Sequence, residues 1–332
     1  MTVTAQTQRR SSLAAQVGGI LLIVLPLFAP ELLISFTPLH AGASMVIAGI
    51  LPVIIAWPFA PRYALACIPL AGMVNAVAVL VHGDRAATTV YVVVLAVALG
   101  LSARAGLHVV GMFVALQPVI TVVSGYHTVA FGDHVPGTVG QAVLFGAIAV
   151  GGGLWAVAIA ALLLRDEVVG PPEPVPWPIV VFYTAALTVL LGVAAFVAST
   201  WFLGTTAGWV LLTIVLVLRP TYDESRRMVA ERAAGTVVGA IASAFIALLV
   251  SNTTLLVGLG TLAMVVAAVL QLLHARYAYF AAFVTAAVAL VNAEHVDVWQ
   301  TDVERVVWTA VGVLAVATVV AAAEASLGRY SD

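Results

Sequence analysis

Long apolar stretches separated by short polar segments run along the whole chain, and this pattern predicts a series of membrane-spanning helices. A helix needs about 20 mostly apolar residues to cross the hydrocarbon core of a bilayer. The predicted spans are approximately residues 15–34, 41–60, 63–82, 87–103, 107–124, 138–164, 179–199, 202–218, 233–250, 253–273, 277–293 and 303–325. The predicted fold class is therefore an all-α integral membrane protein of about 12 transmembrane helices.

A proline-rich segment divides these spans into two equal sets. Residues 165–178, "RDEVVGPPEPVPWP", contain five prolines and predict an extended cytoplasmic linker rather than a helix. The linker separates an N-terminal six-helix membrane repeat, 1–164, from a C-terminal one, 179–332. The sequences "VGQAVLFGAIAV" (139–150) and "VERVVWTAVGVL" (303–314) are similar, which favours two parallel repeats. Chance similarity between two helices rich in alanine and valine stays open as the alternative.

The positions of the arginines predict the orientation of the chain. With the N-terminus inside, the cytoplasmic side receives Arg9, Arg10, Arg62, Arg104, Arg165, Arg219, Arg226, Arg227, Arg232, Arg276 and Arg329. The outer side receives only Arg85 and Arg305, and Asp302 also falls there. Basic residues collect on the cytoplasmic side of membrane proteins. We therefore expect a multi-pass protein of the cell (plasma) membrane with both termini in the cytoplasm.

The composition supports lipid as the solvent and excludes several function classes. The chain is 63% hydrophobic and 8% charged, whereas a soluble domain carries about 25% charged residues. A net charge of -2 provides no basic surface for nucleic acid. The single cysteine, Cys67, excludes a disulfide within the chain and argues against a metal cluster. No catalytic motif is present, so we expect neither an enzyme nor a cofactor or metal.

The charged segment "RPTYDESRRMVAERAAGT" (219–236) stands out between two apolar stretches. Thr221 and Glu224 form a capping-box pattern that predicts a helix starting at Thr221. Pairs at a spacing of four, Asp223 with Arg227 and Arg227 with Glu231, predict ion pairs within this helix. No helix-breaking residue separates it from the next span. The segment is thus expected to form a cytoplasmic helix that continues into the membrane.

Small residues follow at steps of four on the same helix. Gly235, Gly239 and Ser243 would allow another helix to approach closely in lipid. Arg232 lies one turn before this stripe, at the predicted membrane edge. Its side chain can either reach back to the headgroups or turn inward as a receptor for an anion.

Three short motifs in the second half carry a family resemblance. The first consists of Trp209, Thr213, Pro220, Arg226, Arg232, Gly235, Thr236 and Gly239. The second consists of Arg276, Tyr277, Ala278, Phe283, Val284 and Thr285, and the third of Arg305, Thr309 and Gly312. With these motifs, residues 180–325 resemble the fusaric acid resistance protein-like (FUSC) family, which includes the aromatic acid exporters. The first half matches only as a degenerate repeat.

The resemblance implies export of small organic anions, chiefly aromatic carboxylic acids, from the cytoplasm. Arg232 with Thr236 would anchor the carboxylate, because the planar guanidinium group can bind both of its oxygens. Trp209 or Phe283 would form a wall for the ring. Other candidate substrate-binding residues are Thr213, Thr285 and Gln117. The alternatives are packing for Trp209 and Gln117, and hydrogen bonds to carbonyls of their own helices for the two threonines.

Several properties stay open at the level of sequence. The long exporters of this family carry large soluble cytoplasmic domains, whereas only 165–178 separates the halves here. No Asp or Glu lies near the middle of a predicted span, so proton coupling would depend on an end-of-helix residue such as Glu304. A passive anion channel and a non-transporting membrane scaffold are the alternative functions. The expected partners are a small organic anion and the lipid bilayer, and a homo-oligomer stays open.

Overall fold

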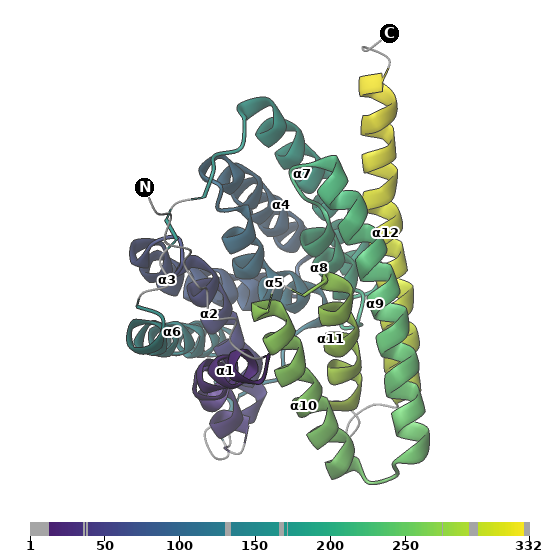
Figure 1. Ribbon diagram of the computed structural model, residues 1–332. Coiled ribbons are helices and arrows are strands. Elements are labelled where there is room, and N and C mark those ends of the chain that lie inside the picture. Colours follow the sequence, from purple (N-terminus) through teal and green to yellow (C-terminus); the bar gives the residue numbers. More distant parts are fainter. Residues whose placement is uncertain are drawn as a thin grey trace, which may run out of the picture.

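The computed structural model describes residues 13–35, 37, 39–129, 134–165, 169–170, 172–273, 275–291 and 298–328. Twelve α-helices make up most of this described part of the chain (Figure 1). The first six are α1 (Leu13–Ser35), α2 (Ala43–Ala56), α3 (Pro61–Val81), α4 (Arg85–Ser102), α5 (His108–Ser124) and α6 (Thr138–Leu163). The others are α7 (Trp177–Trp201), α8 (Gly208–Val217), α9 (Tyr222–Leu249), α10 (Thr253–Leu272), α11 (Tyr277–Val291) and α12 (Val298–Gly328).

Each predicted span overlaps one of these helices, so the all-helical membrane class is confirmed. Of the helices described, seven are long and apolar enough to cross a membrane, judged by length and composition. Five other apolar helices are shorter, and α8 has only ten residues where a span of 202–218 was predicted. The number of twelve crossings therefore stays a prediction.

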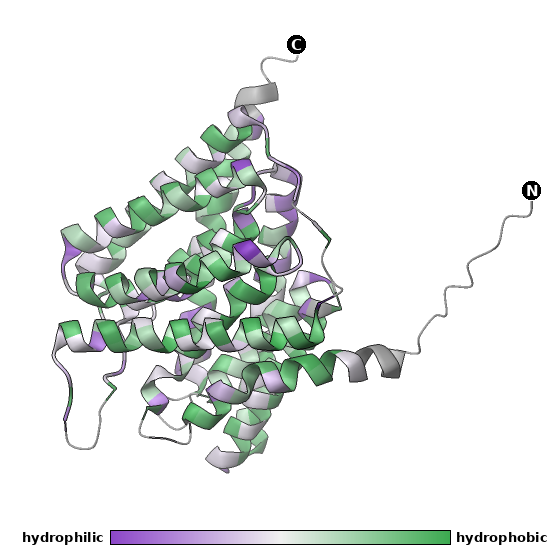
Figure 2. Ribbon diagram, turned by 90° about the vertical axis from the view of Figure 1, so that its left-hand side faces the viewer, coloured by the Kyte–Doolittle hydropathy of each residue, from purple (hydrophilic) through white to green (hydrophobic). Residues whose placement is uncertain are grey.

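The outer faces of the helices are hydrophobic, as contact with lipid requires. Leu22, Leu162 and Leu248 are more than 70% exposed, and many other large apolar side chains face outward. Figure 2 shows hydrophobic residues along most of the helices. A protein in water seldom exposes contiguous apolar surface on this scale. The exposed faces consequently fit a bilayer.

Helix packing follows a similar pattern in the two halves. Helix α3 packs against α5 and α6, and six helices later α9 packs against α11 and α12. The two halves also pack against each other, since α4 contacts α7 and α10 contacts α1. Figure 1 shows α9 and α12 side by side along one edge of the molecule. This edge belongs to the C-terminal half, which holds the buried charged residues described below.

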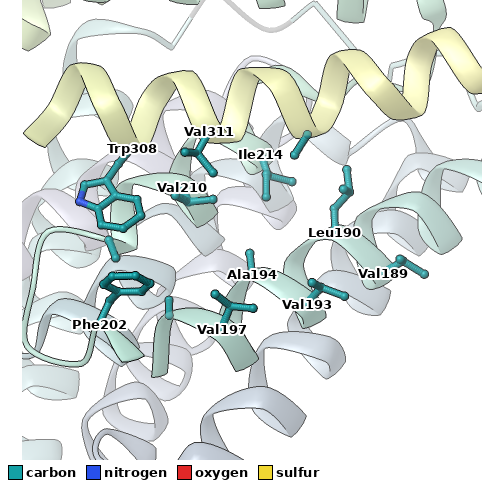
Figure 3. Close-up of a pocket in the computed structure, with 13 residues that line it drawn as sticks. Val189, Leu190, Val193, Ala194, Val197, Phe202, Val210, Ile214, Trp308 and Val311 are labelled. Carbon is teal, nitrogen blue, oxygen red and sulfur yellow. The ribbon is translucent and has the colours of Figure 1, made fainter. Parts of the chain in front are cut away.

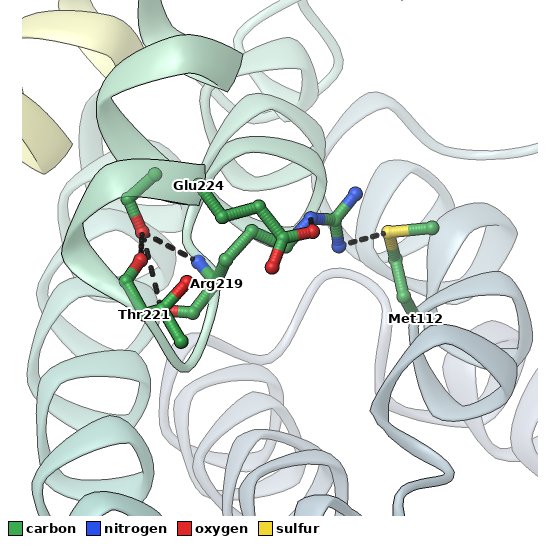
Figure 4. A network of polar contacts seen from close by, with 5 residues as sticks. Met112, Arg219, Thr221 and Glu224 are labelled. Atoms are coloured by element: carbon green, nitrogen blue, oxygen red, sulfur yellow. Dashed lines mark hydrogen bonds and ion pairs between the residues drawn. The ribbon is translucent and has the colours of Figure 1, made fainter. Parts of the chain in front are cut away.

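The junction between α8 and α9 is held by hydrogen bonds of Ser225 and Arg219 (Figure 4). Ser225 Oγ accepts from the Arg219 backbone N–H at 2.9 Å and lies 3.0 Å from the Thr221 carbonyl oxygen, to which it can donate. The Arg219 guanidinium donates to Met112 Sδ at 2.9 Å and lies 3.6 Å from a Glu224 carboxylate oxygen. Helix α9 begins directly after Thr221, as predicted. The predicted capping box is wrong, however, because the Thr221 side chain makes no cap hydrogen bond.

The charged helix is paired with other segments rather than with itself. Among the described residues, its ion pairs join Arg226 to Glu324 at 3.5 Å and Glu231 to Arg276 at 3.6 Å, in addition to the contact of Arg219. The predicted pairs of Arg227 with Asp223 and Glu231 are therefore wrong. The physical reason is that Glu231 is buried against α11, where it also accepts a hydrogen bond from the Ala278 backbone N–H.

Replacing Ser225 with alanine tests this junction. The variant leaves the buried Arg219 N–H without its acceptor, and we expect it to lose about 1–2 kcal/mol of stability. The midpoint of thermal unfolding in detergent should fall, whereas Ser251→Ala, at an exposed loop position, should leave it unchanged. Equal midpoints for the two variants would show that the hydrogen bonds of Ser225 do not stabilise the junction.

Candidate functional site

A cluster of buried polar side chains lies between α8, α9, α11 and α12. It contains Arg232 and Thr236 from α9, Arg305 and Thr309 from α12, Thr213 from α8 and Thr285 from α11, and it includes the partly buried Trp209 of α8, which contacts Arg305. We call this set the arginine cluster. Its two arginines and four threonines are at most 2% exposed. Buried polar side chains normally have hydrogen-bond partners, so the partners of each member decide how the cluster is interpreted.

Arg305 is a fully buried cation without a hydrogen-bond partner in the described part of the chain. Its Nε, Nη1 and Nη2 atoms all lack one. The Arg305 Cζ atom lies 3.9 Å from the centroid of the Trp209 ring, which is a cation–π contact. That contact compensates for only part of the lost hydration, because burying a charged group costs several kcal/mol. Arg305 therefore keeps unused capacity to donate hydrogen bonds to an anion.

Arg232 is the second buried cation of the cluster. Its Nε and Nη2 atoms have no partner among the described residues, and its side chain is 1% exposed. It lies near enough to Arg305 for the two charges to interact electrostatically. Because two buried like charges repel each other, an anion between them would relieve the repulsion.

The four threonines of the cluster have buried hydroxyl groups. Thr236 lies one turn after Arg232, and Thr309 one turn after Arg305. Thr213 faces Gly312 of α12, since a Cβ atom added to that glycine would lie 2.8 Å from Thr213 Cβ. The hydroxyl oxygens of all four threonines have no partner among the described residues.

The alternative of hydrogen bonds from Thr213 and Thr285 to their own helix carbonyls is therefore not what the structure shows. Thr285 instead lies against Gly239 of α9, whose added Cβ atom would be 2.8 Å from Thr285 Cβ. Each of the four hydroxyl groups therefore keeps a hydrogen that it can donate.

The glycines of α9 let α11 approach closely at this site. A Cβ atom at Gly235 would collide with the Ala278 carbonyl oxygen, and one at Gly239 with that of Ala282. Only glycine permits this contact. Ser243, the third member of the predicted stripe, faces α12 instead, with Oγ 2.7 Å from Asp302 Oδ2.

Two residues predicted at the outer surface are buried within the bundle. Asp302 is 3% exposed and Arg305 is 1% exposed. The physical reason is that α12 begins at Val298, five residues before the predicted span, so both side chains lie on the packed face of the helix. Nearby Glu304 points elsewhere and accepts hydrogen bonds from Thr206 Oγ1 at 2.5 Å and Gln300 Nε2 at 3.1 Å.

Two other candidates do not belong to the cluster in the described structure. Gln117 donates a long hydrogen bond, 3.5 Å, to Thr121 within α5, and no described contact joins it to either arginine. Phe283, the alternative wall for a ring, is 38% exposed on α11. Trp209 is thus the aromatic side chain that contacts a buried cation of the cluster.

Sequence reasoning missed Arg305 and Thr309 as site members, although a signal was present. Both belong to the third family motif, and Arg305 aligns with Gln141 when the last spans of the two halves are compared. Gln141 is also buried, but it exchanges two hydrogen bonds with the Val129 backbone, at 3.0 and 2.7 Å. A neutral, satisfied side chain in one half thus corresponds to an unpartnered cation in the other.

A separate apolar cavity of about 400 Å³ lies between α7, α8 and α12 (Figure 3). Hydrophobic side chains line it, and Phe202 and Trp308 meet edge to face with ring centroids 4.9 Å apart. On α8, the lining residues Val210 and Ile214 directly follow Trp209 and Thr213 of the arginine cluster, and consecutive residues of a helix point in different directions. The cavity and the cluster therefore lie on different faces of α8.

Comparison with known proteins finds a family to which part of the chain is similar. Residues 193–319 match the sequence model of the family described as "Fusaric acid resistance protein-like", which confirms the predicted resemblance. The matched range includes every member of the arginine cluster. No protein of curated function and no solved structure matches the chain.

Proposed function

We propose that this protein is a membrane transporter of small organic anions, in which the arginine cluster binds the anion. The observation that carries the proposal is the pair of buried guanidinium groups, in which all three nitrogen atoms of Arg305 and the Nε and Nη2 atoms of Arg232 lack hydrogen-bond partners among the described residues. The family match supports a membrane transport or resistance function for the same residues. The proposal goes further in naming aromatic carboxylic acids as substrates and export as the direction.

The charges of the cluster favour an anion with two oxygen acceptors. Arg232 and Arg305 contribute two positive charges, and Asp302 is the one carboxylate that interacts electrostatically with Arg305 in the described structure. A carboxylate can accept paired hydrogen bonds from a guanidinium fork and further ones from threonine hydroxyls. Trp209 and the aliphatic side chains around it would contact the ring of an aryl acid.

The position of the arginines along the helices fits passage from the cytoplasm. Arg232 follows the charged beginning of α9, which we assign to the cytoplasmic side. Arg305 follows the beginning of α12, which we assign to the outer side. Since each arginine is 1% exposed, the described conformation is occluded. Helices must therefore move for an anion to pass. Export of an anion from a negative-inside cell gains about 2.3 kcal/mol per charge per 100 mV.

The proposal includes the division of the chain into two membrane repeats and their orientation. We infer two parallel six-helix repeats, 1–164 and 179–332, joined by the linker 165–178, in a plasma-membrane protein with both termini in the cytoplasm. The corresponding contacts of α3 and α9, and the mutual contacts between the halves, support this arrangement. Charged members of the cluster occur only in the C-terminal repeat, so the two repeats would have different roles.

A growth experiment tests the proposed function. An acid-sensitive bacterial host expressing the wild-type protein should tolerate aryl carboxylates better than one carrying an empty vector. Arg232→Ala should lose the protection, because truncating one partner of a buried charge contact costs about 2–5 kcal/mol, or at least about 30-fold in affinity. Arg226→Ala, which removes an exposed arginine from the same helix, is the matched control and should protect fully.

The outcome requires equal amounts of each variant in the membrane, checked by immunoblotting. Protection by Arg232→Ala equal to that of the wild type would exclude this arginine from the path. Absence of protection by the wild-type protein against every acid tested would favour a non-transporting scaffold. A passive channel would protect, but its flux would rise linearly with the anion concentration instead of saturating.

A further inference from the structure

Asp302 is a buried carboxyl group next to the arginine cluster. It lies in the first turns of α12 and is 3% exposed. Its Oδ2 atom is 2.7 Å from Ser243 Oγ, while Oδ1 has no partner among the described residues. A buried carboxylate that makes a single hydrogen bond is poorly stabilised in its charged form. This environment favours the binding of a proton by the carboxyl group.

The hydroxyl group of Ser243 can serve both protonation states. Its oxygen lies 2.8 Å from the Gly239 carbonyl oxygen as well as 2.7 Å from Asp302 Oδ2, but it has one hydrogen to donate. When Asp302 is charged, the hydroxyl group donates to the carboxylate. When Asp302 is protonated, the carboxyl group donates to Ser243, and the hydroxyl group donates to Gly239. Neither state requires heavy atoms to move.

Arg305 is the charged neighbour of this carboxyl group. It follows Asp302 by three residues, a spacing that places both on one face of α12, and the two groups interact electrostatically. From α9, Ser243 contacts Asp302, and Arg232, three turns earlier on the same helix, is the charged residue that interacts electrostatically with Arg305. The described helices α7, α8 and α11 contain no Asp, Glu, Lys or Arg. Glu304 of α12 is bound to Thr206 and Gln300.

We propose that Asp302 is a proton-binding residue that controls whether an anion can occupy Arg305. The inference rests on the proposed function and adds a mechanism by which protonation controls anion binding. A charged Asp302 repels an incoming anion and offers Arg305 a competing carboxylate on the same helix. A protonated Asp302 does neither and remains bound to Ser243. Anion binding therefore strengthens as the pH falls and weakens as the pH rises.

Equilibrium binding of radiolabelled benzoate to the purified full chain in detergent, over a series of pH values, tests the proposal. Wild-type affinity should rise as the pH falls, by about 5- to 150-fold, which is the usual range of coupling between two sites. Asp302→Asn imitates the neutral carboxyl group and should bind benzoate tightly at every pH. Glu304→Gln, the matched control, should keep the pH dependence of the wild type.

A second variant covers the case in which Asp302→Asn does not fold. Ser243→Ala keeps the carboxyl group and removes its partner. Because the hydrogen bond to a charged carboxylate is stronger than the bond to a neutral one, the loss favours the neutral state. Its affinity should therefore rise at a higher pH than that of the wild type.

The contrary results distinguish the two proposals. Benzoate binding that varies with pH identically in the wild type, Asp302→Asn and Ser243→Ala would overturn the role of Asp302 and leave the proposed function standing. No saturable benzoate binding by the wild type at any pH would contradict the proposed function and the proton control together.

Discussion

Replacing Arg305 with methionine is expected to abolish anion transport while leaving the thermal stability unchanged or higher. The buried guanidinium group makes no hydrogen bond with the described residues, so its removal takes away a desolvated charge without breaking a hydrogen bond. The effective cost of burying one charged group is several kcal/mol, and a methionine side chain does not carry this cost. The lost cation–π contact with Trp209 offsets part of this gain, and methionine restores some of the contact through its sulfur atom.

The loss of function should be large because Arg305 is proposed to contact the anion directly. Truncation of one partner of a buried charge contact costs about 2–5 kcal/mol, which lowers the affinity for benzoate at least about 30-fold. Benzoate binding and the midpoint of thermal unfolding, both measured in detergent, provide the two readouts. Arg226→Met, at an exposed position of α9, should change neither.

The combination of the two readouts separates a functional arginine from a structural one. If Arg305 stabilised the helix bundle, Arg305→Met would lower the unfolding midpoint, and any loss of binding would follow from misfolding. A lower midpoint together with full benzoate binding by the remaining folded protein would contradict the assignment of Arg305 to the anion site.

Gly239→Ala is expected to be the most destabilising of the small substitutions in the C-terminal half. The added Cβ atom would collide with the Ala282 backbone oxygen and lie 2.8 Å from Thr285 Cβ. Because the obstacle includes backbone, α9 and α11 must separate, and overpacking of this kind costs about 1–3 kcal/mol or more. The same separation should displace Thr285 and weaken anion binding.

Gly258→Ala is the matched control for this prediction. Nothing lies within 4 Å of a Cβ atom added at Gly258 of α10, so the change should be neutral or should stabilise the helix by up to about 1 kcal/mol. The fraction of each variant that stays monodisperse after heating measures the difference. Equal survival of the two variants would mean that α9 and α11 are not in close contact in the membrane protein.

The helices could be predicted from the sequence because lipid imposes one simple requirement. A helical segment in the membrane must satisfy its backbone N–H and C=O groups with hydrogen bonds inside the helix, and it must expose apolar side chains to lipid. This requirement located every described helix, and the absence of a breaker predicted that the charged segment 219–236 continues into α9. It could not show that α8 has only ten residues, because residues 202–218 are apolar beyond the helix ends.

The members of the site were harder to predict than the helices. Arg232, Thr236, Trp209, Thr213 and Thr285 were named from motifs, and the structure places them on the adjacent helices α8, α9 and α11, with all but Trp209 fully buried. Arg305 was assigned to the outer surface because the positive-inside rule treats each arginine as a topology signal. The rule does not distinguish an arginine at a helix end from one on the packed face of a helix.

The ion pairs of the charged segment show the same limit. A spacing of four residues makes a pair possible within one helix, but Glu231 faces Arg276 and the start of α11 instead. Which face of α9 is buried depends on neighbours distant in sequence. Such contacts decide the partners of Arg219, Arg226 and Asp302, and no local pattern contains them.

The most direct test of the central claim is an experimental structure of the protein with 4-bromobenzoate, in which the bromine atom marks the ligand. The carboxylate is expected to lie within hydrogen-bond distance of Arg305, with Arg232 or a threonine of the cluster as its second donor. Bromine density at another place, with both guanidinium groups unchanged and unliganded, would contradict the claim that the arginine cluster binds the transported anion.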